Sequence, residues 1–263
     1  MTEYETIRLE TPQPDLLIVT LNRPQASNAF NTQMGRDLEA LWTTLIAAPG
    51  TFRCVILTGA GERAFCAGGD LKERHGMSDA EWVAQHEIFE RAYWRLLDCP
   101  VPVIAAVNGS AFGGGLEIAL ACDFIYAVSD ARFALPEVTL GIMPGAGGTQ
   151  FLARAAGERR AKEIILTGRP FSAAEALDWG IVNKLCERAE LLPEAMATAA
   201  TICANAPISV RQAKKSIHHG LQLDLKNGLM FEIEAYNRMV GTEDRLEGVR
   251  AFNEKRKPAF KGR

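Results

Sequence analysis

The sequence has few of the features that mark metal-binding or disulfide-bonded proteins. Its six cysteines are scattered, and no two of them form a CxxC pair, so neither a zinc site nor a disulfide framework is indicated. We expect reduced, mostly buried thiols in a cytoplasmic protein. The four histidines have no metal-ligand spacing and no nucleophile motif beside them, so we predict no bound metal and no catalytic histidine.

Long hydrophobic runs and an excess of positive charge are also missing. No run of about 18 uncharged apolar residues occurs, and we predict no membrane-spanning segment. The N-terminal stretch MTEYETIRLE is too polar for a signal peptide and contains acids that a transit peptide avoids. The formal net charge of -3 argues against nucleic acid or an anionic membrane as the main partner. A small-molecule ligand is the remaining expectation.

Strand and helix patterns alternate through most of the chain. Gly-rich turns follow the predicted strands, which indicates an α/β fold with ligand-binding loops at the carboxyl ends of strands. From about residue 187 the pattern is helical, and we predict an α/β core over 1–195 and a helical region over 196–263. The expected elements are a hairpin (4–10 and 16–22), helices over 31–48, 79–97 and 114–122, and strands over 54–59, 102–107 and 123–129.

Three consecutive glycines, Gly113, Gly114 and Gly115, stand between a predicted strand and a predicted helix. Glycine costs backbone entropy on folding and adds no packing. The first N–H groups of a helix have no intrahelical partner, and without a Cβ a ligand oxygen can approach them closely. The stretch therefore has the construction of an oxyanion hole, with a simple strand-to-helix turn as the alternative.

A second glycine-rich stretch, AFCAGGDLKE (64–73), follows another predicted strand and presents Gly68 and Gly69 before a possible helix. Two strand ends could thus each offer one N–H to the same oxygen. The alternative is an ordinary loop in which Asp70 caps a helix.

Two glutamates accompany these turns. Glu117 follows the three glycines, and Glu137 follows Pro136, from which we expect an extended loop with apolar neighbours. An apolar setting disfavours the charged form of a carboxyl group, which suits a proton donor. Two such carboxylates predict general acid–base chemistry. The nearby segment PGAGGTQ (144–150) lacks the lysine and the spacing of a phosphate-binding P-loop.

Taken together, the motifs resemble the enoyl-CoA hydratase (crotonase) family over residues 15–258. The resemblance implies a crotonase (ClpP-like) spiral of ββα repeats, a C-terminal helical trimerisation region, and assembly as a homotrimer or a dimer of trimers. It also implies an acyl-CoA thioester as the ligand and no separate cofactor, since coenzyme A is part of the substrate. The segments that carry the resemblance, in chain order, are LNRPQASNAF, AFCAGGDLKE, NGSAFGGGLEIALACDF, FALPEVTLGIMPGAGGTQ and EGVRAFNEKRKPAF.

The resemblance assigns roles to four residues. The backbone N–H groups of Gly69 and Gly114 correspond to the oxyanion hole, Glu117 to the group that activates water for addition to Cβ, and Glu137 to the group that protonates Cα. The implied activity is reversible syn hydration of a 2-enoyl-CoA. Isomerase-like members keep an acid at the position of Glu137 and lose the one at Glu117, whereas carnitinyl-CoA dehydratases keep both. A crotonase-fold isomerase or a specialised dehydratase is therefore the alternative, and the net charge argues against an RNA-binding role known in some members.

For coenzyme A itself, the resemblance implies contacts in both halves of the chain. A basic cluster near the C-terminus, which includes Lys255, suits the phosphates of CoA, with a solvated charged tail as the alternative. The aromatic residues of the 79–97 helix could be core or acyl-pocket lining. The implied CoA contacts are Ala26, Asn28, Ala29, Ala67, Asp70, Leu71, Phe252 and Lys255.

Overall fold

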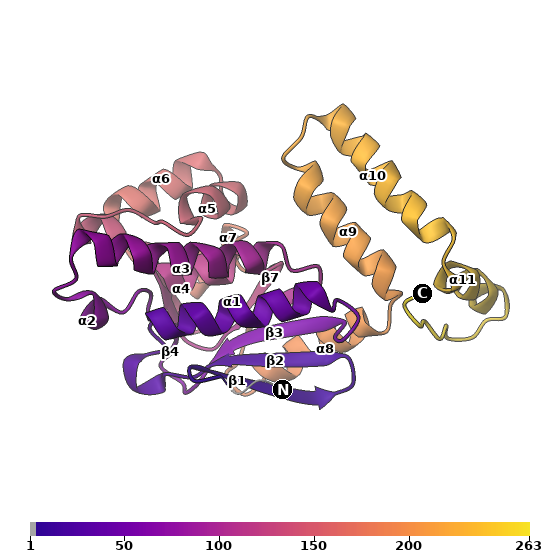
Figure 1. The fold of residues 1–263 in the computed structure, drawn as a ribbon, viewed down its shortest axis with the longest axis horizontal. Helices are drawn as coiled ribbons and strands as arrows, with labels where there is room; N and C mark the ends of the chain where they lie inside the picture. The colour runs from indigo at the N-terminus through magenta and orange to yellow at the C-terminus, as the bar shows by residue number, and fades with distance from the viewer. Residues whose placement is uncertain (1–3) are drawn as a thin grey trace.

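Two β-sheets form the centre of the computed structural model, which describes residues 4–263 (Figure 1). The larger sheet contains, in spatial order, β1 (Ile7–Gln13), β2 (Leu16–Leu21), β3 (Cys54–Gly59), β5 (Val103–Val107), β7 (Phe124–Val128) and β10 (Lys184–Cys186). The smaller sheet contains β4 (Ala64–Cys66), β6 (Ser110–Phe112), β8 (Arg132–Ala134) and β9 (Phe171–Ser172). Apart from the antiparallel pairs β1–β2 and β8–β9, neighbouring strands are parallel.

The two sheets are built by a repeated ββα unit. The pairs β3–β4, β5–β6 and β7–β8 each contribute their first strand to the larger sheet and their second strand to the smaller one. In the smaller sheet Cys66 and Phe133 both pair with Ala111, and Ala134 pairs with Phe112. Because the carboxyl ends of parallel strands lie at one edge, the segments that leave β4, β6 and β8 start side by side.

Helices follow these strands and close the repeats. Asn31 caps α1, since its Oδ1 accepts the N–H of Met34 at 3.0 Å, and Ser78 and Glu81 form a capping box at the start of α3. The long helices α1 and α3 pack side by side (Figure 1). The helices of the body are α1 (Thr32–Ala47), α2 (Leu71–Arg74), α3 (Asp79–Leu97), α4 (Gly114–Leu120), α5 (Gly148–Ala156), α6 (Glu158–Thr167) and α7 (Ala173–Asp178), with 3-10 turns η1 (Pro24–Ala26) and η2 (Glu137–Leu140).

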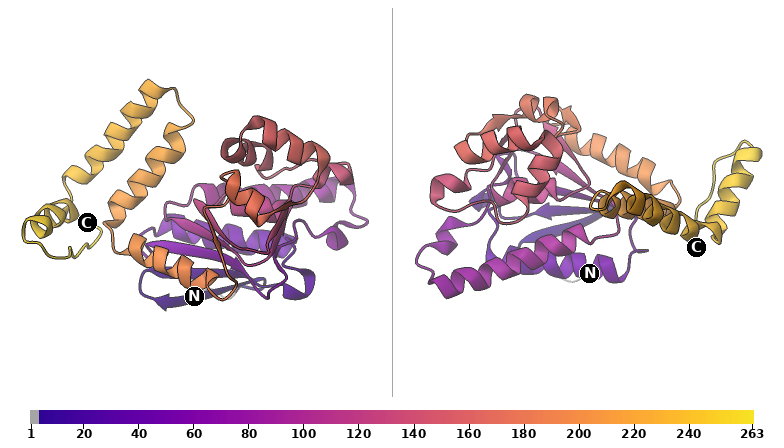
Figure 2. Two further views of the ribbon diagram at one scale, coloured as in Figure 1. Left: turned by 180° about the vertical axis from the view of Figure 1, so that it is seen from behind. Right: turned by 90° about the horizontal axis from the view of Figure 1, so that it is seen from above.

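The predicted hairpin, helices and strands are confirmed to within a few residues at their ends. The predicted boundary at 195/196 falls inside α8 (Leu191–Cys203), which packs on β3, β5 and β7 of the larger sheet. The chain leaves the body only after α8, because the buried face of that helix belongs to the core. Figure 2 shows α9 (Pro207–Gly220), α10 (Leu225–Val240) and α11 (Glu243–Asn253) extending away from the body.

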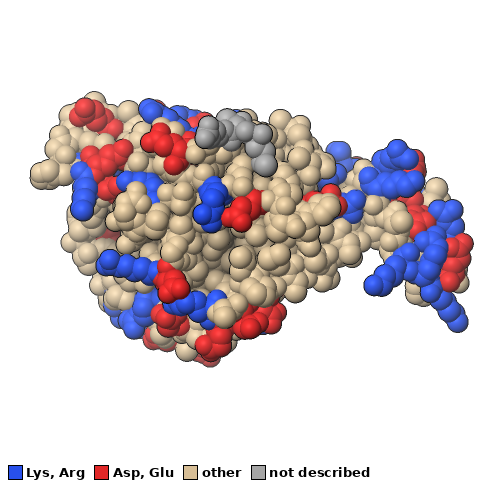
Figure 3. Space-filling model, turned by 90° about the horizontal axis from the view of Figure 1, so that it is seen from below, with Lys and Arg blue, Asp and Glu red and all other residues tan. Residues whose placement is uncertain are grey.

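The three extending helices carry exposed apolar side chains. Leu221, Leu225 and Phe252 are 77%, 79% and 84% exposed, a pattern typical of surfaces that bind a partner. The predicted trimerisation role of this region stays a prediction. Lys and Arg side chains gather at this end of the molecule (Figure 3), where Arg250 and Arg256 pair with Glu247 at 2.8 and 2.6 Å.

Two further predictions concern the described residues as a whole. All six cysteines are free, and five of them are buried, as predicted. Over residues 4–263 we find no helix with both the length and the apolar character needed to cross a bilayer.

Candidate active site

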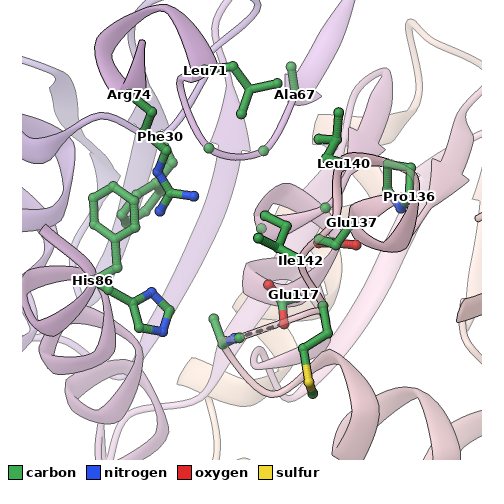
Figure 4. Close-up of a pocket in the computed structure, with 18 of the residues that line it drawn as sticks. Phe30, Ala67, Leu71, Arg74, His86, Glu117, Pro136, Glu137, Leu140 and Ile142 are labelled. Carbon is green, nitrogen blue, oxygen red and sulfur yellow. Dashed lines mark hydrogen bonds between the residues drawn. The ribbon is translucent and has the colours of Figure 1, made fainter. Parts of the chain in front are cut away.

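A cavity of about 400 Å³ opens at the edge where β4, β6 and β8 end (Figure 4). Gly69 and Gly114 each follow one of these strands by a few residues, and Glu137 follows the third. The fold therefore brings all four predicted catalytic residues to one cavity, with Glu117 one turn into α4. The opposite wall comes from α2, α3 and the segment before α1, and contains Phe30, Arg74, Trp82, His86, Phe89 and Tyr93.

The N–H groups of Gly69 and Gly114 are adjacent and both lack a protein acceptor within residues 4–263. Gly69 forms a parallel bridge with Phe30, in which Phe30 donates to the carbonyl of Gly68 at 2.7 Å and Asp70 donates back to Phe30 at 3.0 Å. This pairing leaves the N–H of Gly69 on the opposite side. Gly114 begins α4, so its N–H has no intrahelical acceptor. A Cβ added to Gly114 would lie 3.8 Å from the Gly69 nitrogen, so one ligand oxygen could accept from both N–H groups.

The peptide group of Gly114 is held from behind by α3. The hydroxyl of Tyr93 donates to the carbonyl of Gly114, and the Tyr93 side chain is buried beside the ring of Phe30, which in turn packs against Phe89. Burial and then the charge of Glu117 raise the pKa of Tyr93 well above its usual value. The phenol thus stays protonated and remains a donor, which fixes the orientation of the Gly114 backbone.

Glu117 is buried, with only 3% of its surface exposed. Its Oε1 accepts the N–H groups of Ala146 and Gly148, each at 2.8 Å, at the start of α5. Burial raises the pKa of Glu117, and these N–H groups, together with that of Gly145, act in the opposite direction by stabilising the carboxylate. Over residues 4–263 no protein donor reaches Oε2, so this oxygen is free to bind a ligand.

Glu137 lies across the cavity in a different setting. The expectation of an extended loop was wrong: Glu137 is the first residue of the 3-10 turn η2, because proline restrains its own φ and the residue before it rather than the residue after it. Glu137 is 8% exposed, and the Oε2 of its carboxyl group is buried without a hydrogen-bond partner in the described part of the chain. Burial, with a smaller contribution from the charge of Glu117, raises the pKa of Glu137 to about 7.

The predicted CoA contacts divide into three groups. Ala67 and Leu71 line the cavity. Phe252 and Lys255 lie at the end of α11, and neither lines the cavity of this chain. These two residues therefore do not contact a ligand inside this chain's own cavity, and their predicted contact with coenzyme A stays a prediction.

The remaining predicted contacts support the loop before α1. The side chain of Asn28 is fully buried and bonds the backbone of Arg23, Ala60 and Ala64 at 2.9 to 3.0 Å. Asp70 caps α2 and pairs with Arg23 at 2.9 Å, so the helix-cap reading of Asp70 is confirmed. Ala26 and Ala29 lie in the same loop, joined by a 3.0 Å backbone hydrogen bond. The side chains of Asn28 and Asp70 thus hold the Gly69 segment in place.

Sequence reasoning missed Arg74 and His86 in the cavity wall and the loop that binds Glu117. Trp82, His86, Phe89 and Tyr93 recur at helical spacing on α3, and this spacing could have placed His86 in the cavity. A Cβ on Gly145 would lie 2.8 Å from the His86 ring, so the histidine packs directly on the loop that binds Glu117.

Comparison with known proteins agrees with this geometry. Residues 12–263 match the family model described as enoyl-CoA hydratase/isomerase. YngF of Bacillus subtilis is 47% identical over 98% of this chain and 99% of its own length. The short-chain-enoyl-CoA hydratase of Clostridium acetobutylicum is 44% identical over 94% of each chain. The crystal structure of an enoyl-CoA hydratase from Bacillus anthracis superposes with a TM-score of 0.96 at 44% identity, over 98% of this chain and 100% of the other. The fold is the crotonase fold, and the chain belongs to the enoyl-CoA hydratase/isomerase family.

Proposed function

We propose that this protein is an enoyl-CoA hydratase that adds water reversibly to the double bond of a short 2-enoyl-CoA thioester. The observation that carries the proposal is the pairing of two unlike carboxyl groups, Glu117 and Glu137, beside two free N–H groups in one cavity. The Glu117 carboxylate is stabilised by backbone N–H groups, whereas Glu137 has an unpaired buried oxygen and a raised pKa. One group therefore suits a base and the other an acid. The named short-chain hydratase among the relatives supports the same reaction.

In the proposed reaction the N–H groups of Gly69 and Gly114 bind the thioester oxygen. Glu117 takes a proton from water as the water oxygen bonds to Cβ, and the double-bond electrons move towards the thioester oxygen as an enolate. Glu137 then gives its proton to Cα and becomes a carboxylate. Transfer of the proton held by Glu117 to Glu137 restores the starting state. The product is a 3-hydroxyacyl-CoA, and both new bonds lie on the face of the substrate that the two glutamates share.

The presence of Glu117 beside Glu137 favours hydration over isomerisation of the double bond. Shifting a double bond needs one group that removes and returns a proton, a task within the reach of Glu137 alone. Isomerisation would leave no use for the buried Glu117, whose burial is costly and whose Oε1 is fixed by two N–H groups. Hydration uses both groups.

The first test is direct. Purified protein mixed with crotonyl-CoA is expected to remove the absorbance of the conjugated enoyl thioester, with 3-hydroxybutyryl-CoA as the product identified by mass spectrometry. Conversion of a 3-enoyl-CoA to its conjugated isomer, without hydration of any short 2-enoyl-CoA, would refute the proposal in favour of an isomerase.

The proposed roles also predict a pH dependence. Glu137 must begin protonated, and its pKa is raised to about 7, so kcat/KM for hydration is expected to fall roughly tenfold per pH unit above about pH 7. The profile is measured with crotonyl-CoA across pH 6 to 9, and Glu137→Gln, which does not titrate, should lack this descending limb in its residual activity. A rate that rises through pH 7 would instead show that Glu137 acts as the base.

A further inference from the structure

The cavity contains a cation that its own carboxylates do not neutralise. Arg74 ends α2 and points into the cavity from the wall opposite Glu117 and Glu137 (Figure 4). Over residues 4–263 no carboxylate lies within ion-pair distance of its guanidinium group. Half-burying a charge without a counterion is unfavourable, and burial lowers the pKa of Arg74 from its usual value.

The guanidinium group is held in a fixed orientation. Its Cζ lies 4.1 Å from the centre of the Trp82 ring and 5.4 Å from that of Phe89, so both rings attract the cation. Its Nε donates to Oε1 of Gln85 at 2.8 Å. Gln85 is itself buried and fixed, because its amide nitrogen donates to Thr32 at 2.8 Å and to Glu73 at 2.7 Å.

These contacts leave the two terminal nitrogens of Arg74 without a hydrogen-bond partner in the described part of the chain. The charge of Glu73 acts to raise the pKa of Arg74. The carboxylate of Glu73, however, accepts hydrogen bonds from the side chain of Gln85 and, at 2.9 Å, from the N–H of Thr32. A planar fork with two free nitrogens matches a carboxylate in geometry and charge. The terminal nitrogens of Arg74 are thus free to bind a negatively charged group of the ligand.

The position of Arg74 indicates which part of the ligand carries that anion. Its Cζ lies 3.6 Å from the place of a Cβ on Gly69, and Gly69 is a proposed donor to the thioester oxygen. The phosphates of coenzyme A are separated from the thioester by the whole pantetheine arm. We infer that Arg74 binds a carboxylate at the end of a short acyl group, so that the preferred substrates are 2-enoyl-CoA thioesters of dicarboxylic acids. This inference rests on the proposed function for the placement of the thioester.

The test compares two ligands that differ only at the end of the acyl chain. Glutaryl-CoA and pentanoyl-CoA each have five acyl carbons and the same CoA phosphates, and glutaryl-CoA has a terminal carboxylate in place of a methyl group. Calorimetric titration of the full-length protein is expected to show at least tenfold tighter binding of glutaryl-CoA. Arg74→Gln should bring this preference close to one, because it removes a hydrogen-bonded charge pair, and Arg74→Lys should keep part of it.

Lys72→Gln is the matched control, because Lys72 is an exposed cation on the same short helix and does not line the cavity. It should keep the full preference. Absence of a preference in the unaltered protein, or equal weakening of both ligands by Arg74→Gln in a variant that still unfolds cooperatively, would overturn the inference. Crotonyl-CoA turnover is scored separately: hydration without a carboxylate preference refutes only the inference, and the preference without hydration of crotonyl-CoA or of glutaconyl-CoA refutes only the proposed reaction.

Discussion

Glu117→Gln is expected to lower kcat for crotonyl-CoA hydration about 1000-fold, within the range for loss of a general base. The glutamine oxygen can still accept the N–H groups of Ala146 and Gly148, which bond Oε1 at 2.8 Å in the present structure. The substituted side chain therefore keeps its place, but a neutral amide cannot take a proton from water. Because burial disfavours the charged form of Glu117, we expect the melting temperature to stay equal or rise.

The measurement combines steady-state kinetics with thermal unfolding of the same samples. Glu87→Gln is the control, since Glu87 is an exposed glutamate on α3 that does not line the cavity, and it should change neither quantity. Activity of Glu117→Gln within tenfold of the unaltered protein would show that Glu117 is not the base. A large fall in melting temperature would show that its charge serves the fold instead.

The local parts of this site were predictable because each is encoded by a short segment. Glycines after a strand pattern indicated the Gly69 and Gly114 turns, and the helical pattern over 31–48 indicated α1. The smaller sheet is harder to find, since β4 and β6 have three residues each. An alternation of apolar and polar residues over only three positions does not distinguish a strand from a loop. Only the family resemblance supplied the ββα repeat.

Contacts between distant segments had no signal in the sequence. The loop that binds Glu117 lies 29 to 31 residues further along the chain, and its composition, PGAGG, does not indicate that its N–H groups bind a carboxylate of the same chain. The orientation of Arg74 depends on Gln85, which in turn depends on Thr32, 53 residues away. Such networks arise from packing, so sequence patterns can name candidate residues but cannot show which of them meet.

Gly115→Ala is expected to damage stability and activity together. Its Cβ would lie 2.1 Å from the carbonyl oxygen of Cys66 and 2.7 Å from the carbonyl carbon. Both are backbone atoms, so α4 or the end of β4 must move, at a cost of about 3 kcal/mol in the free energy of unfolding. That movement separates Gly69 from Gly114, and loss of one oxyanion donor typically lowers kcat at least about 100-fold.

Two matched glycine-to-alanine changes separate these effects. Gly50→Ala meets no atom within 4 Å and should leave crotonyl-CoA turnover and the melting temperature unchanged. Gly114→Ala makes only ordinary contacts, 3.4 Å from the Tyr93 hydroxyl and 3.8 Å from the Gly69 nitrogen, so it should fold yet place a methyl group beside the Gly69 donor. Equal melting temperatures of Gly115→Ala and Gly50→Ala would contradict the close contact between position 115 and the Cys66 carbonyl group. Full activity of Gly114→Ala would contradict the shared oxygen site, because the methyl group would crowd an oxygen bound to the N–H of Gly69.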